Sequence, residues 1–338
     1  MKKILAIAAV VAVALTSCVK NETFAPANEI SFENFTLSSK ALVNAGAFDI
    51  ALTFGVFATD NGTDFTFVDN DEVVYKTTYW GFNPAKYWPT NAGAPVDVDF
   101  YAYYPYNDNT GTEQVACDLT AGISITGADL GTTIGSQKDY LVAPVVVDKN
   151  VTNASAGVDV VFKHIASLIL FSAEDVTEIA ELQNLVTINS ITIKQVSTSG
   201  DYANTAAGTV AGTWTPDTAA DLDAIAVNKA VTTAGLELTS TTEKPVLVVP
   251  TDLTAATEQV VINYTIADYV YGGYNFTGTT TNATFDLKAG AITKWEQGKK
   301  YVYNLKFKLT EELEITFNPT VTDWTDGGSA DLEVNVAL

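Results

Sequence analysis

The sequence predicts an all-β protein, and three observations lead to this fold class. Apolar and polar residues alternate with a period of two in many short segments, clearly so at residues 96–104 and 331–338. The composition leans toward Thr, Val, Tyr, Phe and Asn, which favour strands and turns over helices. Clusters of Gly, Asn, Asp and Thr separate these segments at short intervals, as expected of β-sandwiches rather than of a parallel sheet.

The first eighteen residues have the pattern of a bacterial lipoprotein signal. Lys2 and Lys3 precede an apolar run at 4–15, which is shorter than the roughly 20 residues that span a bilayer. The run ends in LTSC, which resembles a lipobox, where the cysteine becomes the acylated N-terminus. We therefore predict a signal peptide at 1–18 and a lipid such as palmitate on Cys18. An ordinary secretory signal with a chance cysteine is the alternative.

Strand-like segments follow a polar tether at 19–28. They cover residues 30–37, 48–58, 64–68, 73–79, 96–104, 139–147, 158–171, 187–194, 245–249, 259–267, 269–276, 281–287, 300–309, 312–317 and 331–338. Within them, the YGGY sequence at 271–274 predicts a tight hairpin. Apolar spacing at 173–186 and, more weakly, at 217–227 predicts two helices. We place a domain boundary near residue 160, which divides the chain into domains at 19–160 and 161–338.

The charge of the chain excludes several classes of partner. The formal net charge is −22, and all 18 basic residues are lysines. A surface this acidic repels nucleic-acid phosphates and anionic lipid headgroups, so neither is expected to bind. Cys117 is the one cysteine that remains after Cys18, so no intramolecular disulfide can form, and we expect Cys117 to be a small buried residue.

Signals of catalysis or of metal binding are weak. His164 is the single histidine and lies in an apolar context, which is typical of a core residue. No nucleophile, zinc or nucleotide motif accompanies it. The acidic runs at 60–64 and 69–72 could hold calcium, but they lack the full loop pattern, and solvated turns are favoured. We predict no enzymatic activity, no cofactor and no metal site.

Aromatic residues gather in residues 80–106 and allow two interpretations. Exposed rings stack on sugars, so Trp80, Trp88 and Tyr103 are candidate glycan contacts. The favoured interpretation is that these rings fill a sandwich core.

The end of the chain is an amphipathic strand. Residues 325–330 are rich in Gly, Ser and Asp and read as a hinge, and Leu332, Val334, Val336 and Leu338 then alternate with polar residues. This strand either completes its own domain or pairs with a groove on another molecule. Burial of four Leu and Val side chains would contribute roughly 6–12 kcal/mol. Ordering eight residues costs a comparable amount, so the acceptor groove must be preformed.

The start of the mature chain could supply that groove. Residues 28–37 form a strand that is followed by Ser38, Ser39, Lys40 and Ala41. Cleavage between Lys40 and Ala41 would release 19–40 as a propeptide and leave an empty place in the N-terminal domain. The strand at 331–338 of a neighbouring molecule could then fill this place.

Together these motifs resemble the fimbrillin (type V pilin) family of lipoprotein-derived surface fimbriae. The matching segments, in order, are LTSC, ISFENFTLSSKA, YWGFNPAKYWP, VDFYAYYPY, DYLVAPV, VDVVFKHIASLILF, WEQGKKYVYNLKFKL and VTDW. The resemblance implies two tandem transthyretin-like β-sandwich domains, export as a lipoprotein, proteolytic removal of the first strand and polymerisation through the C-terminal donor strand. The chain departs from the family at Lys40, because the family carries an arginine at the cleavage site.

We therefore predict a structural subunit of cell-surface fimbriae that mediates cell adhesion by donor-strand exchange. Its expected partners are other fimbrial subunits, a host or bacterial surface receptor, and the outer membrane through the lipid on Cys18. The alternative is a lipid-anchored fimbrial anchor, or a glycan-binding surface lipoprotein that stays monomeric.

Overall fold

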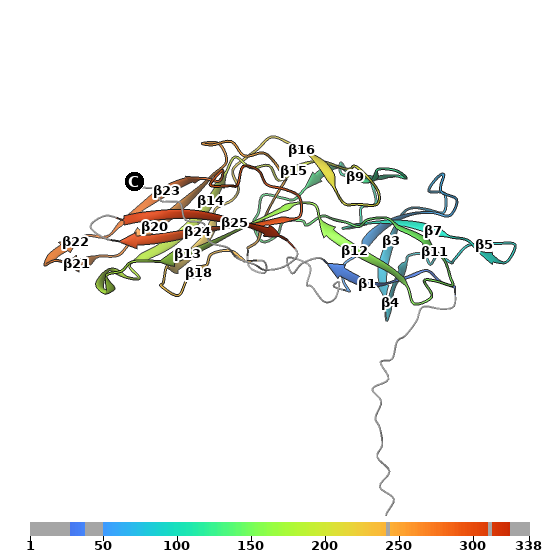
Figure 1. Cartoon of the computed structure of the whole chain (residues 1–338), viewed down its shortest axis with the longest axis horizontal. Coiled ribbons are helices and arrows are strands. Elements are labelled where there is room, and N and C mark those ends of the chain that lie inside the picture. The colour runs from blue at the N-terminus through green and yellow to red at the C-terminus, as the bar shows by residue number, and fades with distance from the viewer. Residues whose placement is uncertain (1–27, 38–49, 241–243, 310–312, 325–338) are drawn as a thin grey trace, which may run out of the picture.

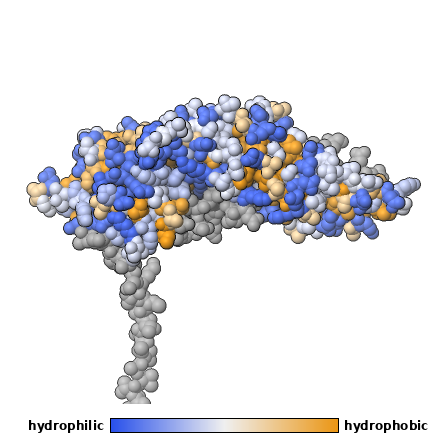
Figure 2. All heavy atoms as spheres, turned by 180° about the vertical axis from the view of Figure 1, so that it is seen from behind, coloured by the Kyte–Doolittle hydropathy of each residue, from blue (hydrophilic) through white to orange (hydrophobic). Residues whose placement is uncertain are grey.

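The computed structural model describes residues 28–37, 50–240, 244–309 and 313–324, and in these ranges the protein is almost entirely β-structure (Figure 1). The all-β prediction is confirmed. The body is elongated, with the strands up to β12 at one end and most strands from β13 onward at the other. Seen from behind, most of its surface is hydrophilic, with scattered apolar patches (Figure 2). No helix in the described ranges is long and apolar enough to cross a membrane.

An eight-stranded sheet forms the N-terminal end of the body, in the order β10-β12-β1-β4-β3-β2-β7-β11 within the described residues. Its strands are β1 (Ser31–Leu37), β2 (Phe54–Thr59), β3 (Val68–Lys76), β4 (Tyr79–Phe82), β7 (Val98–Tyr104), β10 (Leu141–Val142), β11 (Val146–Lys149) and β12 (Val158–His164). The two-residue strand β10 also pairs with β7, where Leu141 lies opposite Tyr104. The sheet therefore closes on itself, and β1 is one member of the closed ring.

Two sheets pack face to face at the C-terminal end. One sheet contains β13 (Ser167–Asp175), β18 (Leu236–Glu237), β19 (Val246–Val248), β24 (Lys299–Leu309) and β25 (Leu313–Asp323). The other contains β14 (Val186–Lys194), β17 (Ile225–Ala230), β20 (Gln259–Ile266) and β23 (Thr279–Asp286). Alternate side chains such as Phe171, Tyr303 and Ile262 meet in one buried cluster, because period-two alternation turns every second residue inward.

A third sheet is built from segments on both sides of residue 160. β8 (Gln114–Asp118) and β9 (Gly122–Asp129) pair with β15 (Ser199–Asn204) and β16 (Gly212–Pro216), in the order β16-β15-β9-β8. This composite sheet shares a buried cluster with residues from both ends of the body, including Tyr103, Leu168 and Trp324. The boundary near residue 160 stays a prediction, and these contacts join the segments on its two sides.

Two short hairpins project from the body. β5 (Thr90–Asn91) pairs with β6 (Ala94–Pro95), and β21 (Tyr269–Tyr271) pairs with β22 (Tyr274–Phe276). The second is the tight hairpin predicted at 271–274. Gly272 and Gly273 have φ values of 61° and 84°, a left-handed conformation that glycine adopts without strain.

Both predicted helices are wrong. Residues 173–186 contain the end of β13, the short 3₁₀ helix η1 (Ala180–Leu182) and the start of β14. Asp175 closes this loop, because its carboxylate accepts hydrogen bonds from the backbone N–H groups of Thr177 and Asn184. Residues 217–227 form a loop instead. Within it, Ala220 makes an isolated β-bridge with Val196, and the chain then continues into β17.

A half-buried carboxylate, that of Glu113, links the composite sheet to the residues around β10. Glu113 accepts hydrogen bonds from Lys138 Nζ at 2.6 Å, from the Tyr140 hydroxyl at 2.6 Å and from Asn107 Nδ2 at 2.9 Å. Burial raises the pKa of Glu113, but the hydrogen bonds from Lys138, Tyr140 and Asn107 outweigh it and hold the pKa below its ordinary value of 4.5. The folded state therefore resists protonation of Glu113.

Glu113→Gln is expected to destabilise the fold in a pH-dependent way. A lowered pKa gives stability that is present above the ordinary pKa and lost as the pH falls below it. The variant should lose roughly 1–3 kcal/mol of unfolding free energy at pH 7 and clearly less at pH 3, as measured by urea unfolding. Glu181→Gln, at an exposed position, is the control and should change little. An equal loss at both pH values would contradict the assigned role of the ionised carboxylate.

Candidate strand-exchange groove

Strand β1 lies between two strands that come from distant parts of the sequence. It pairs in parallel with β12, where Phe32 is opposite Val158 and Leu37 is opposite Phe162. On its other side it pairs antiparallel with β4, where Ser31 is opposite Gly81. A register shift between Glu33 and Thr36 marks an irregularity in the pairing with β12. Within the described residues, β1 is the strand that joins β12 to β4 in this ring.

The side chain of Phe32 is the central apolar anchor of β1. Its ring makes edge-to-face contacts with Phe54, Phe82 and Phe100, at centroid distances of 5.4, 5.3 and 5.8 Å. Ile30, two residues earlier, is also fully buried. Burial of one such side chain contributes roughly 1.5–3 kcal/mol, and edge-to-face pairs add to this. The groove that holds β1 is therefore strongly apolar.

A buried ionic group fixes the entry of β1. The Glu29 carboxylate accepts a hydrogen bond from Lys76 Nζ at 2.8 Å and from the Tyr79 hydroxyl at 3.0 Å. Burial, and then the hydrogen bond from Tyr79 to the Glu29 carboxylate, raise the pKa of the Tyr79 phenol. Backbone hydrogen bonds from Ile30 N to Lys86 O and from Trp88 N to Asn28 O continue the pairing. Residues 28–32 are thus held by polar and by apolar contacts.

Gly157 allows β1 and β12 to approach closely. It has a φ of +134°, and a Cβ added there would lie 2.6 Å from Cγ of Glu33 and 3.1 Å from its backbone nitrogen. Any larger residue would push β1 away from β12. The absence of a side chain at Gly157, just before β12, therefore leaves room for β1 in the groove.

Removal of β1 would open the ring. Adjacent strands lie about 4.8 Å apart, so β12 and β4 would be left about 10 Å apart, with unpaired backbone groups on both facing edges. The rings of Phe54, Phe82 and Phe100 would line the exposed slot. A slot of this kind can accept one extended segment that carries apolar side chains at every second position.

Several predicted site residues lie outside the described residues. These are Cys18, Lys40, Ala41, Leu332, Val334, Val336 and Leu338. The lipidation site, the processing site and the donor strand therefore stay predictions.

The three candidate glycan contacts lie in the interior of this structure. Trp80 and Trp88 are 6% and 7% exposed and pack in the same cluster as Phe32, while Tyr103 is fully buried. The Tyr103 hydroxyl donates to Asn70 Oδ1 at 2.6 Å, and burial raises the pKa of the phenol. Their side chains fill the cores of the N-terminal sheet and of the composite sheet.

His164 is a buried residue at the end of β12. Its Nδ1 lies 2.8 Å from Oδ2 of Asp139, and its ring stacks on Trp324 at a centroid distance of 3.6 Å. Trp324 is 2% exposed and donates a backbone hydrogen bond to Gly298. The last described residue is therefore anchored against the strand that pairs with β1. The predicted hinge at 325–330 follows this anchor directly and leads to the predicted donor strand at 331–338.

The remaining candidate sites are Cys117 and the acidic turn at 60–64. Cys117 is half-buried, and burial raises the pKa of its thiol. At 60–64, Asn61 Oδ1 accepts hydrogen bonds from Thr63 and Asp64 in a local turn. The described residues contain no cluster of three metal-ligating side chains.

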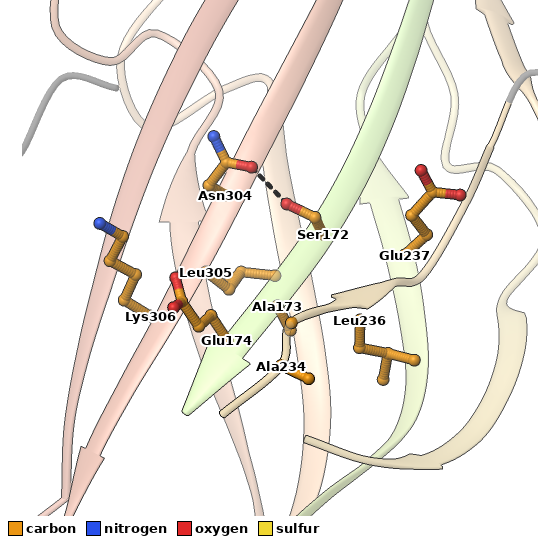
Figure 3. Close-up of a pocket in the computed structure, with 10 residues that line it drawn as sticks. Ser172, Ala173, Glu174, Ala234, Leu236, Glu237, Asn304, Leu305 and Lys306 are labelled. Atoms are coloured by element: carbon orange, nitrogen blue, oxygen red, sulfur yellow. Dashed lines mark hydrogen bonds between the residues drawn. The ribbon is translucent and has the colours of Figure 1, made fainter. Parts of the chain in front are cut away.

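A surface pocket of about 330 Å³ lies where β18 meets β13 and β24 (Figure 3). Ser172 donates a hydrogen bond to Asn304 on its wall. The other lining residues include Ala234 and Leu236 and the charged residues Glu174, Glu237 and Lys306. The hydrogen bond of the Ser172 hydroxyl goes to the Asn304 amide and not to one of these carboxylates.

Sequence reasoning missed three features of the groove. Ring closure depends on β10, which is too short to show a pattern. The Glu29–Lys76–Tyr79 cluster joins residues about 50 positions apart, and no local signal marks it. Gly157 was one glycine among 22, although its place just before a strand is a signal for close backbone approach.

Comparison with known proteins shows which family this chain matches and which solved structures share its fold. The model of the fimbrillin-like family matches residues 39–324, which is most of the chain. A fimbrial protein from Bacteroides vulgatus is similar in structure, with 16% identity, a TM-score of 0.56, and coverage of 88% of this chain and 99% of that one. A putative cell adhesion protein from Bacteroides uniformis has 18% identity, a TM-score of 0.53, and coverage of 88% and 100%.

A search of curated proteins found no match. At these identities the two solved structures support the fold alone, while the family match extends over nearly all the described residues. The chain belongs to the fimbrillin-like family.

Proposed function

We propose that this protein is a structural subunit of a surface fimbria that polymerises by donor-strand exchange. In this proposal β1 leaves the groove between β12 and β4, and residues 331–338 of a neighbouring subunit take its place. The observation that supports the proposal is the position of β1 in a closed ring, between two strands distant in sequence and over a cluster of aromatic side chains.

The predicted donor segment is similar to β1 in length and in apolar pattern. β1 spans seven residues, and the predicted donor strand at 331–338 spans eight. Ile30, just before β1, and Phe32 within it are buried two positions apart, and the tail offers Leu332, Val334, Val336 and Leu338 at the same spacing. A one-residue slip would turn all four side chains away from the slot, so the register would be strict.

A groove that is already formed favours assembly, because the incoming strand replaces β1 in a site of fixed shape. A free tail must offset about 1–2 kcal/mol of backbone entropy per ordered residue. The groove already holds its shape around β1, so the incoming strand gains backbone pairing and apolar burial in a preformed site. Trp324 fixes the root of the tail, which restricts the directions in which the donor segment can extend.

Processing and anchoring complete the proposal. Cleavage between Lys40 and Ala41 would detach β1 from the rest of the chain, and a lipid on Cys18 would hold the unprocessed protein at the outer membrane. The partners are other fimbrial subunits and, for adhesion, a host or bacterial surface receptor. The role is structural and not enzymatic, which agrees with membership of a family of fimbrial proteins.

An uncleaved chain would have a second role. It keeps β1 in the groove, as in this structure, and could only donate its own tail. Such a chain would be a lipid-anchored fimbrial anchor or a solitary surface lipoprotein.

Mass spectrometry of the N-terminus distinguishes these roles. The measurement is made on protein sheared from intact cells. A chain that begins at Ala41 is expected for the proposed fibre subunit. A chain that begins at acylated Cys18 would assign the anchor or solitary role and contradict the stalk role.

A further inference from the structure

The outer face of one C-terminal sheet presents ordered rows of uncharged side chains. Residues of β14, β20 and β23 that point away from the core lie opposite one another across the three strands. Three adjacent rows define what we call the neutral face: Thr187, Thr265 and Thr280, then Ser190, Asn263 and Asn282, and then Thr192, Val261 and Thr284. These side chains are half-buried or exposed, and a register shift in β14 between Ile188 and Ser190 separates the first row from the second.

Hydrogen bonds between side chains hold the neutral face in one arrangement. Asn189 Nδ2 donates to Asn263 Oδ1 at 2.8 Å and to Thr265 Oγ1 at 2.9 Å. Asn263 Nδ2 in turn donates to Asn282 Oδ1 at 2.8 Å, and the hydroxyls of Thr265 and Thr280 are 2.8 Å apart. A face that is ordered before binding loses little side-chain entropy when a partner docks.

The absence of charge on this face contrasts with the rest of the molecule. Within the described strands β14, β20 and β23, charged side chains appear only in the row beyond the neutral face, at Lys194 and Asp286, while the outer strand β17 carries exposed Lys229. The other C-terminal sheet carries Glu174, Lys306 and Lys308 on its outer face. The chain as a whole has a net charge of −22.

We propose that the neutral face is a side-by-side contact between two copies of this chain. Two bodies of net charge −22 repel each other, and the repulsion is least where both present an uncharged surface. An isologous contact, face against face about a two-fold axis, needs no other partner. A glycan is the less suitable occupant, because the three rows carry no aromatic ring on which a sugar could stack.

The area of the neutral face determines how strongly two copies can bind each other. The three rows span about five residues along three strands and cover about 250 Å², from a rise of about 3.4 Å per residue and a strand spacing of about 4.8 Å. A stable pair usually needs about 800 Å² per partner. Single copies should therefore separate readily, whereas surfaces that display many copies should adhere through repeated contacts. The inference builds on the proposed function in one respect: a fibre would display the face many times.

The test uses multivalent display that does not depend on polymerisation. The full chain, with an N-terminal hexahistidine tag, is tethered to phosphatidylcholine vesicles that contain a nickel-chelating lipid, and vesicle clustering is followed by light scattering. The variant is Asn282→Asp with Thr284→Asp. Asp at 282 can still accept the hydrogen bond from Asn263, so the ladder is kept while charge is added. The matched control, Asn91→Asp with Thr213→Asp, adds the same charge at exposed positions on other sheets.

We expect wild-type and control vesicles to cluster and the neutral-face variant to cluster at least about tenfold less at 0.15 M salt. In 1 M salt the variant should recover, because the Debye length falls from about 8 Å to about 3 Å. Equal clustering of variant and control, or no clustering of the wild type, would overturn the inference. Fibre formation is scored separately: if the wild type clusters vesicles but forms no fibres, the strand-exchange proposal fails and this contact stands.

Discussion

Val334→Asp is expected to abolish fibre formation. The proposed donor strand would carry the new carboxylate into the slot lined by Phe54, Phe82 and Phe100, where no cation lies among the described lining residues. Burial of an unpaired charge costs several kcal/mol, and each 1.4 kcal/mol weakens binding tenfold. Assembly should weaken at least about a hundredfold, measured as fibre length and number by electron microscopy and as polymer fraction by sedimentation.

The neighbouring residue supplies a matched control. Asn335→Asp adds the same charge one position further along, where period-two alternation turns the side chain to the opposite side of the strand. This variant should form fibres like the wild type. Thermal unfolding of both variants shows whether the subunit itself is intact. If both variants polymerise equally well, residues 331–338 are not the donor strand.

Phe32→Ala is expected to destabilise the unprocessed chain by about 3–5 kcal/mol, measured by urea unfolding. The ring is 1% exposed and touches three other rings, so truncation leaves a cavity at the centre of the cluster. The same variant should release β1 faster after cleavage, because the strand has lost its main anchor. Fibre growth from cleaved subunits should then start earlier than in the wild type.

An exposed phenylalanine is the control for this substitution. Phe276, in the hairpin β21–β22, is 37% exposed, and its ring stacks on that of Tyr269 at a centroid distance of 4.6 Å. Phe276→Ala should cost at most about 1.5 kcal/mol. A loss for Phe32→Ala no larger than for Phe276→Ala would show that β1 contributes little to the folded subunit, and that its removal could not create a high-energy groove.

The sequence predicts the strands well where the alternation is regular. β14 was expected at 187–194 and spans Val186–Lys194, and the glycine pair at 272–273 sets the hairpin between β21 and β22. The strand at 30–37 was recognised because Ile30 and Phe32 alternate with Ser31 and Glu33. The pairing of this strand with β12 was not predictable, since more than 120 residues separate Phe32 from Val158.

Local pattern failed where a side chain redirects the backbone. Val176, Ile179, Leu182 and Leu185 have helical spacing, yet Asp175 binds two backbone N–H groups beyond β13 and closes a loop instead. Hydrogen bonds from a carboxylate to nearby amides compete with the helix in this way. The anchor of Trp324 on His164 was likewise invisible, because it joins residues that are 160 positions apart in the chain.

The most direct test of strand exchange is an electron cryomicroscopy map of the native fibre at a resolution that shows side chains. The segment between β12 and β4 identifies the strand in the groove. The account predicts Leu332, Val334, Val336 and Leu338 there, continuous with Trp324 of the neighbouring subunit. If the map instead shows Phe32 still packed against Phe54, Phe82 and Phe100 in every subunit, β1 does not leave and the fibre is held together in another way.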